Sequence, residues 1–251
     1  MTTRTPTSTL IQRLAHKDES VRLRAAMDLG TSEDPEAAEV LVARLGAEAD
    51  PAVKEMITWA AVQHAGRAMG ALMVQLYSAE AAVRAQAAHV LSKIGGETVV
   101  RPILPVIGDE DPVVAVKAAR AAASTGSPEV VPALIGRLGQ GDAAVRDAVS
   151  DALLALSEWT VGPLIEALAD PDPFVRIHAA DTLSDLGSPG ADRAIPVLAA
   201  HLTDAEADVR LAMLCALSRL DPEQTDGLLR DLAVGEDAEL AYVAGRLLRR
   251  H

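Results

Sequence analysis

The sequence predicts an all-α fold, an α-solenoid in which about eight antiparallel helix pairs stack into a superhelix. Three observations predict it. One motif returns every 30 to 34 residues along the chain. Each copy begins with an acidic residue suited to the N-terminus of a helix. Apolar residues then follow at four-residue spacing, which places them on one helical face. Self-similarity at this period is typical of solenoids.

The repeated motif is represented by DPDPFVRIHAADTLSDLG at residues 170–187. Indexing each copy on its first apolar face residue gives steps of 32, 30, 31, 31, 30, 34 and 31 residues. A pair of amphipathic helices cannot bury its apolar face alone, so the copies are expected to stack around one continuous core. The index residues are Val21, Val53, Val83, Val114, Val145, Val175, Val209 and Leu240.

Each copy is expected to form a helix that we call helix B. The residue three positions before the index is acidic in every copy. An aspartate at this position can accept hydrogen bonds from the first-turn amides, and any acid there suits the positive end of the helix dipole. These acids are Asp18, Asp50, Glu80, Asp111, Asp142, Asp172, Glu206 and Asp237. In three copies the next residue is a proline, which is tolerated at this position: Pro51, Pro112 and Pro173. Gly30, Gly95 and Gly187 are expected to end their helices.

A second apolar run precedes helix B in each copy and is expected to form helix A. Three of these runs contain a proline near their start, Pro132, Pro163 and Pro196, where the missing N–H costs little. Each repeat is therefore expected to consist of helix A, a short turn and helix B. The three runs are residues 130–138, 161–168 and 194–202.

Composition narrows the class of protein. Eight repeats occupy residues 7–251, so we expect a single solenoid domain without a linker, preceded by a short disordered tail at residues 1–6. Hydrophobic residues make up 49% of the chain but aromatic residues only 2%, which predicts a core of Leu, Val, Ile and Ala. No apolar stretch is long enough to span a membrane, and the first residues lack the apolar core of a secretory signal. Because the only cysteine is Cys215, we expect no internal disulfide. Taken together, these features favour a cytoplasmic protein.

The spacing Asp-x-x-Val-Arg-x-x-Ala-Ala-x-x-Leu resembles the HEAT-like repeats first described in phycobilisome lyases, and the resemblance covers residues 7–251. It implies that helix B lines a concave face. It also implies that the acid and the basic residue after the index form a stacked interaction between neighbouring repeats. Ala115 and Ala241 depart from this pattern. The implied pairs are Asp18/Arg22, Asp50/Lys54, Glu80/Arg84, Asp142/Arg146, Asp172/Arg176 and Glu206/Arg210.

The net charge of −13 is unevenly distributed. Residues 1–125 contain 13 basic and 15 acidic residues, a net charge of −2. Residues 126–251 contain 10 basic and 21 acidic residues, a net charge of −11. Such a surface would repel a phosphate backbone over its second half, so nucleic-acid binding is not expected. A basic protein partner fits this charge better.

The exposed side of helix B follows from its geometry. Positions 3, 6 and 10 after the index lie opposite the buried positions, so they are predicted to form the recognition surface of the concave groove. Along the chain this surface begins with Met and Trp, and continues with cations and then carboxylates. The predicted partner-binding residues are Met56, Trp59, Gln63, His89, Lys93, Lys117, Arg120, Asp151, His178, Asp181 and Asp185.

For several of these residues, a purely structural role remains an alternative to partner binding. Trp59 is either an anchor for a partner or packed against helix A or a neighbouring repeat. Lys117 with Arg120, and Asp181 with Asp185, either bind a partner or form ordinary solvated faces. The N-cap acids and the basic residues after the index are expected to be structural.

Evidence for catalysis is sparse. His178, Asp181 and Cys215 are competent metal ligands, or a nucleophile with a base, and could lie near one another on the groove. However, no H-E-x-x-H or C-x-x-C motif is present, and cysteine often serves as a small core residue. The Gly95-Gly96 pair follows a helix instead of opening a phosphate-binding loop. We therefore expect no metal or cofactor.

The function expected from the sequence is a non-enzymatic scaffold or adaptor that binds a peptide or protein segment, possibly basic, in the concave groove. Two alternatives are a lyase-like enzyme or cofactor-chaperone accessory, and a HEAT-like DNA-binding or glycosylase protein. Trp59, Arg120 and Asp151 match the residue types of the glycosylases, but the acidic second half opposes duplex binding. No membrane partner is expected.

Overall fold

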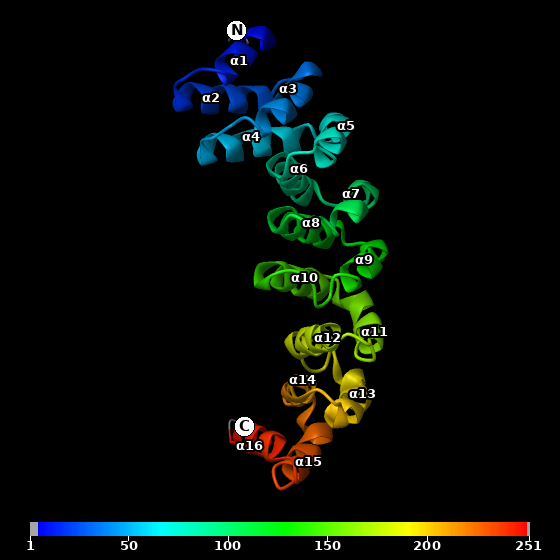
Figure 1. Cartoon of the computed structure of the whole chain (residues 1–251). Helices are drawn as coiled ribbons and strands as arrows, with labels where there is room; N and C mark the ends of the chain where they lie inside the picture. Colours follow the sequence, from blue (N-terminus) through cyan, green and yellow to red (C-terminus); the bar gives the residue numbers. More distant parts are fainter. Residues whose placement is uncertain (1–4, 250–251) are drawn as a thin grey trace. The chain divides into compact units, whose positions relative to one another are not determined.

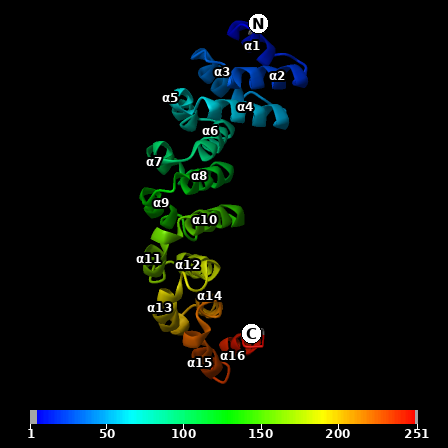
Figure 2. The same ribbon diagram turned by 180° about the vertical axis from the view of Figure 1, so that it is seen from behind.

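In the computed structural model, residues 5–249 are described; residues 1–4 of the expected tail, with residues 250–251, lie outside the described residues. Every regular element in this range is a helix, and within each of the two units described below the helices alternate between an A layer and a B layer (Figures 1 and 2). The all-α solenoid fold is thereby confirmed. The chain divides between Thr125 and Gly126 into two compact units, the N-terminal unit and the C-terminal unit. Within residues 5–249, no helix is both long and apolar enough to cross a bilayer.

The N-terminal unit contains the first four helix pairs. Its A helices are α1 (Thr7–Leu14), α3 (Glu36–Leu45), α5 (Ala65–Leu76) and α7 (Glu97–Ile103), and a 3-10 turn, η1 (Leu104–Val106), continues α7. Its B helices are α2 (Glu19–Gly30), α4 (Pro51–Gln63), α6 (Ala81–Ile94) and α8 (Pro112–Thr125). Helix α2 packs on α4 and α6 packs on α8, so the B helices form a continuous layer backed by the A helices.

The C-terminal unit contains four more pairs. Its A helices are α9 (Val131–Ile135) after η2 (Pro128–Val130), α11 (Ser157–Ala167), α13 (Ile195–Ala200) between η3 (Asp192–Ala194) and η4 (His201–Thr203), and α15 (Pro222–Leu232). Its B helices are α10 (Ala143–Ala155), α12 (Pro173–Leu186), α14 (Ala207–Leu217) and α16 (Ala238–Leu247). Successive B helices pack on one another from α10 to α16.

The core of both units is aliphatic, as expected. The leucines eight positions after the index have no exposed surface in five repeats, and burying each side chain contributes about 1.5–3 kcal/mol. At the index position itself, Val53 and Val209 are fully buried, whereas Val21, Val83 and Val175 keep some exposure. The five leucines are Leu29, Leu91, Leu153, Leu183 and Leu217.

The predicted N-caps are confirmed where the acid is aspartate. Six aspartates accept a hydrogen bond from an amide of the first turn, and each such cap contributes about 1 kcal/mol. Glu80 and Glu206 also stand at the N-cap of their helices, but they make no side-chain cap bond. Glutamate is less suited than aspartate to this bond, because its side chain is longer by one methylene group. The six capping residues are Asp18, Asp50, Asp111, Asp142, Asp172 and Asp237.

Two expectations about helix ends need correction. Gly95 and Gly187 end their helices with positive φ, but Gly30 is the last residue of α2 and does not have positive φ. A Cβ on Gly30 would lie 2.6 Å from Cζ3 of Trp59, so packing accounts for this glycine. Pro132 and Pro196 lie at the start of their helices, whereas Pro163 lies inside α11, because that helix begins at Ser157, directly after a one-residue turn.

The interaction between neighbouring repeats uses a different acid from the one that the family resemblance implies. Arg22 donates to Glu48, Arg84 to Asp109 and Arg176 to Asp204. Each acceptor lies two residues before the N-cap acid of the next repeat and also accepts the backbone N–H of that acid. The N-cap aspartate itself is occupied with its own helix. Among the described residues, only Arg210 reaches an N-cap acid of the next repeat, Asp237, at 3.2 Å.

Candidate binding surface on the B helices

The predicted recognition residues lie on the B helices, and most of them reach solvent. Seven are exposed, and Met56, His89 and Lys117 are half-buried. His178 is 6% exposed, so little of its side chain reaches solvent. Seven of the eleven predicted residues belong to the N-terminal unit and four to the C-terminal unit. The exposed residues are Trp59, Gln63, Lys93, Arg120, Asp151, Asp181 and Asp185.

Trp59 combines the two interpretations left open by the sequence. The residue is 40% exposed. One edge of its indole lies over Gly30 of the preceding repeat, where a glycine is required to make room for the ring. The ring is therefore fixed by packing while its other parts remain accessible, as is typical of aromatic anchors at protein interfaces.

Cations gather on α6 and α8 in the N-terminal unit. Burial lowers the pKa of Lys117, and the positive charges of Arg120 and Lys93 lower it further. Burial and Lys117 likewise lower the pKa of His89, against the carboxylate of Glu55, which lies 3.5 Å from its Nε2. These mutual effects show that the side chains share one electrostatic environment. We call Lys93, Lys117 and Arg120 the cationic cluster.

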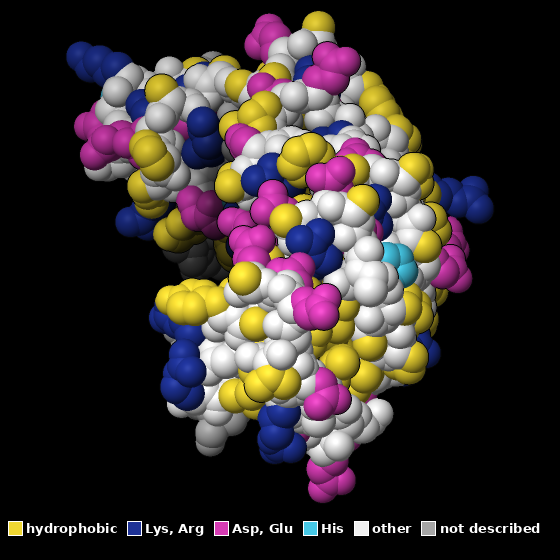
Figure 3. Space-filling model, turned by 60° about the horizontal axis from the view of Figure 1, so that its bottom comes forward, with side chains coloured by type: hydrophobic (Ala, Val, Ile, Leu, Met, Phe, Trp, Pro, Cys, Tyr) yellow, Lys and Arg dark blue, Asp and Glu magenta, His cyan; other side chains and the backbone are white. Residues whose placement is uncertain are grey.

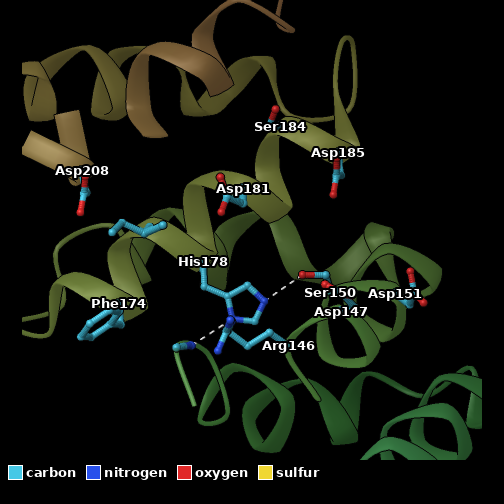
Figure 4. Close-up of a pocket in the computed structure, with 12 residues that line it drawn as sticks. Arg146, Asp147, Ser150, Asp151, Phe174, His178, Asp181, Ser184, Asp185 and Asp208 are labelled. Carbon is cyan, nitrogen blue, oxygen red and sulfur yellow. Dashed lines mark hydrogen bonds between the residues drawn. The ribbon is translucent and has the colours of Figure 1, made fainter. Parts of the chain in front are cut away.

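An acidic hollow of about 930 Å³ lies in the C-terminal unit between α10 and α12. Figure 4 shows Asp147 and Asp151 on α10, with Asp181 and Asp185 on α12. Asp208, at the start of α14, completes the five carboxylates that line it. Acidic side chains are spread across the face of the molecule shown in Figure 3, with several near its centre.

Two further side chains give the acidic hollow a mixed character. Phe174, near the start of α12, is 66% exposed and lies at the edge of the hollow. Arg146 is the only Lys or Arg among its described lining residues. Its Nη1 donates to the carbonyl of Gly141 at 2.6 Å, and no ion pair is found for it within residues 5–249. Desolvation by the walls and the charge of Asp185 raise the pKa of Asp181.

His178 belongs to a hydrogen-bond chain whose direction can be assigned (Figure 4). The backbone N–H of Gly139 donates to Nδ1 at 2.9 Å, so the ring proton must be on Nε2. Nε2 lies 2.8 Å from Oγ of Ser150, which lies 3.0 Å from Oγ1 of Thr182. Thr182 donates to the carbonyl of His178 at 2.8 Å. Ser150 therefore accepts from the imidazole and donates to Thr182. Burial lowers the pKa of His178, which agrees with a neutral ring.

This chain of bonds disagrees with the catalytic and metal-binding interpretations of His178. A general base for Ser150 would need a free lone pair on Nε2, but that nitrogen carries the proton. Nδ1 is occupied by Gly139 and cannot bind a metal. Burial and then Asp181 raise the pKa of the Cys215 thiol, which disfavours the reactive thiolate. Among the described residues, no group of three or more His, Cys, Asp or Glu side chains has a geometry suited to a metal ion.

Sequence reasoning missed four charged or aromatic residues that line the acidic hollow: Arg146, Asp147, Phe174 and Asp208. It treated position 3 after the index as exposed, but Ala148, His178 and Ala212 at this position are buried. The small side chains of two of these residues were a signal of close packing. The surface is instead shifted toward the residue before the index, where Phe174 and Asp208 are exposed.

Comparisons with known proteins identify the repeats. The sequence matches the family described as HEAT repeats over residues 7–77, 69–153, 141–218 and 161–249. None of the curated proteins compared with it matches.

Solved structures also resemble the chain. Kap95p, in a structure describing its binding to RanGDP, is 13% identical with a TM-score of 0.61 over 95% of this chain and 39% of that one. Importin beta is 14% identical with a TM-score of 0.60 over 96% of this chain and 40% of that one. The phycocyanin lyase complex of CpcE and CpcF from Nostoc sp. PCC7120 is 21% identical with a TM-score of 0.44, over 99% of this chain and 95% of that chain. At these identities, the likeness to Kap95p and importin beta concerns the fold alone.

Proposed function

We propose that this chain, which belongs to the HEAT-repeat family, is a non-catalytic scaffold that binds a basic segment of a partner protein in the acidic hollow. The observation that carries the proposal is the grouping of five aspartates around one depression of about 930 Å³ on the B helices. Lysine or arginine side chains of a partner would meet carboxylates on both α10 and α12. The cytoplasmic location expected from the sequence is part of this proposal.

Exposed Phe174 supports a protein segment as the ligand more than a free cation. An aromatic side chain with 66% of its surface in water gains from contact with an apolar group of the partner. A segment with basic residues beside an apolar one would satisfy both the carboxylates and the ring. Each exposed carboxylate–cation pair contributes about 0.2–1 kcal/mol, so several pairs are needed for useful affinity.

The shared fold supports protein binding as the class of function. Kap95p, which has a similar fold, binds the protein RanGDP. Protein binding by this chain is consistent with that use of the fold. The likeness to Kap95p extends no further than the fold, so it does not indicate which kind of segment is bound. The proposal of a basic segment rests on the charges of the acidic hollow.

Enzymatic activity, the alternative considered from the sequence, receives no support from the acidic hollow. The Ser150–His178 pair has its proton on the nitrogen that faces the serine, so it offers no base. A lyase-like accessory would carry a chromophore or other cofactor, and an absorbance spectrum of the protein purified from its native host would reveal one.

A labelled peptide that alternates lysine pairs with leucine provides the test of the acidic hollow. Fluorescence anisotropy should show binding that weakens with salt. The Asp181→Asn/Asp185→Asn variant removes two pairs and should weaken binding roughly two- to thirtyfold. The matched control, Glu129→Gln/Glu166→Gln, removes two exposed acids from η2 and α11 and should bind like wild type. Equal affinity of all three proteins would rule out the acidic hollow as the site.

A further inference from the structure

The cationic cluster of the N-terminal unit has a charge opposite to that of the acidic hollow. Lys93 lies at the end of α6, and Lys117 and Arg120 lie on successive turns of α8. No carboxylate forms an ion pair with any of the three within residues 5–249. This contrasts with Arg22 and Arg84 of the same unit, each of which forms an ion pair with an acid of the next repeat.

The like charges of the cluster are close enough to disfavour one another. The pKa of Lys117 is lowered by burial and by both neighbours, so its ammonium group is destabilised where it stands. The carboxylate of Glu55 on α4 opposes this effect, but it is paired with His89 and is itself largely exposed. An external anion placed over α6 and α8 would relieve this repulsion.

The distribution of the charges favours an extended ligand. Neighbouring packed helices have axes about 8–10 Å apart, so cations on α6 and α8 are spread along the surface instead of surrounding one point. A chain with several carboxylates matches this spacing better than a single small anion. Trp59 and Met56 on α4 add an accessible apolar surface on the same layer of B helices.

We infer that the B helices of the N-terminal unit bind an acidic protein segment, with Lys93, Lys117 and Arg120 pairing with its carboxylates and Trp59 contacting an apolar residue of the same segment. This site is separate from the acidic hollow and does not depend on it. The scaffold then has two docking surfaces of opposite charge, one in each unit.

The test uses the full-length chain and a fluorescein-labelled peptide that alternates glutamate pairs with leucine. Anisotropy should show binding at low ionic strength that weakens as salt is added. The Lys117→Glu/Arg120→Glu variant should lose on the order of tenfold or more in affinity. Because charge reversal can disturb packing around half-buried Lys117, Arg120→Gln provides a milder variant, expected to be a few-fold weaker, and circular dichroism verifies folding of both.

The matched control is Lys17→Glu/Arg101→Glu, which makes the same charge change at two exposed positions away from the B-helix surface. It should bind the acidic peptide like wild type. Trp59→Ala should also weaken binding while leaving the salt dependence intact. If the control weakens binding as much as the cluster variant, attraction is non-specific and the site is wrong.

Two further arms separate this inference from other possibilities. A single-stranded oligonucleotide of similar charge should bind more weakly than the peptide; tighter binding would assign the surface to nucleic acid and overturn the proposal. The lysine-rich peptide used for the acidic hollow should be unaffected by Lys117→Glu/Arg120→Glu. If Lys117→Glu/Arg120→Glu loses the acidic peptide but keeps the lysine-rich peptide, the result supports the site on the cationic cluster. If wild type does not bind the acidic peptide at all, this site is refuted, and the proposal for the acidic hollow is unaffected.

Discussion

Replacing Glu48 with glutamine should remove the ion pair that joins the first repeat to the second. Glu48 is 3% exposed and accepts hydrogen bonds from Arg22, Arg44 and the backbone N–H of Asp50. Burial alone would raise its pKa, but the bonds from Arg22, the Asp50 amide and Arg44 lower it from 4.5 to about 2. Glutamine keeps the shape but leaves two guanidinium groups without their counter-charge.

The magnitude follows from the pKa. A shift from 4.5 to about 2 corresponds to about 3 kcal/mol of stabilisation by the ionised carboxylate. Removal of one partner of a buried ion pair costs a similar amount, about 3–5 kcal/mol. The folded pKa is depressed, so this stabilisation is fully present above about pH 4.5 and is lost as the pH falls through about 2.

Urea denaturation at several pH values provides the assay. The chain has two tryptophans, Trp59 in the N-terminal unit and Trp159 in the C-terminal unit. In a Trp159→Phe background, fluorescence reports the N-terminal unit. Wild type should exceed Glu48→Gln by about 3 kcal/mol near neutral pH, and the difference should shrink as the pH approaches 2. Exposed Glu39→Gln is the control. A difference below about 1 kcal/mol, or one that does not change with pH, would refute the assignment.

Two other perturbations test close contacts. Gly30→Ala places a Cβ 2.6 Å from Trp59 and about 3.0 Å from the backbone of Ala60, so it should destabilise the N-terminal unit by about 1–3 kcal/mol in the same urea assay. Gly66→Ala meets nothing within 4 Å on α5 and should be neutral or slightly stabilising; equal losses in both would contradict the packing argument. His178→Ala should cost about 1–3 kcal/mol, followed by Trp159 fluorescence in a Trp59→Phe background. Burial depresses the pKa of His178 in the folded protein. The stabilisation that wild type gains from the neutral ring is therefore complete above about pH 6.5 and is lost as the pH falls through the folded pKa. A difference between wild type and variant that does not change with pH would count against the neutral ring.

The repeat architecture could be predicted because it depends on local and periodic signals. An aspartate, an index aliphatic and a leucine eight positions later each act within one helix, and the structure confirms their roles in most repeats. The leucine position predicts burial more reliably than the index position, where Val21, Val83 and Val175 keep some exposure. No long-range information was needed to expect about eight helix pairs, and the described residues contain sixteen α-helices.

The partners between repeats could not be predicted in the same way. From the sequence alone, Arg176 could pair either with the N-cap acid Glu206 or with the loop acid Asp204. Only the conformation of the loop shows that Asp204 accepts from the guanidinium group. The burial of His178 depends equally on contacts between helices. Its ring is satisfied by Gly139, 39 residues away, and by Ser150 on a different helix. Such contacts leave no periodic trace in a single sequence.

Arg146 has a consequence for how a bound segment would change the molecule. In a solenoid, each interface between neighbouring repeats contributes separately to stability. Within residues 5–249, no arginine–carboxylate pair joins α10 to α12, whereas such pairs join the following repeats. A segment bound in the acidic hollow would contact both α10 and α12, and so would link the two repeats in place of the missing ion pair. Amide protons of α10 and α12 should therefore exchange more slowly with deuterated solvent once the guest is bound, and those of α14 and α16 should respond less.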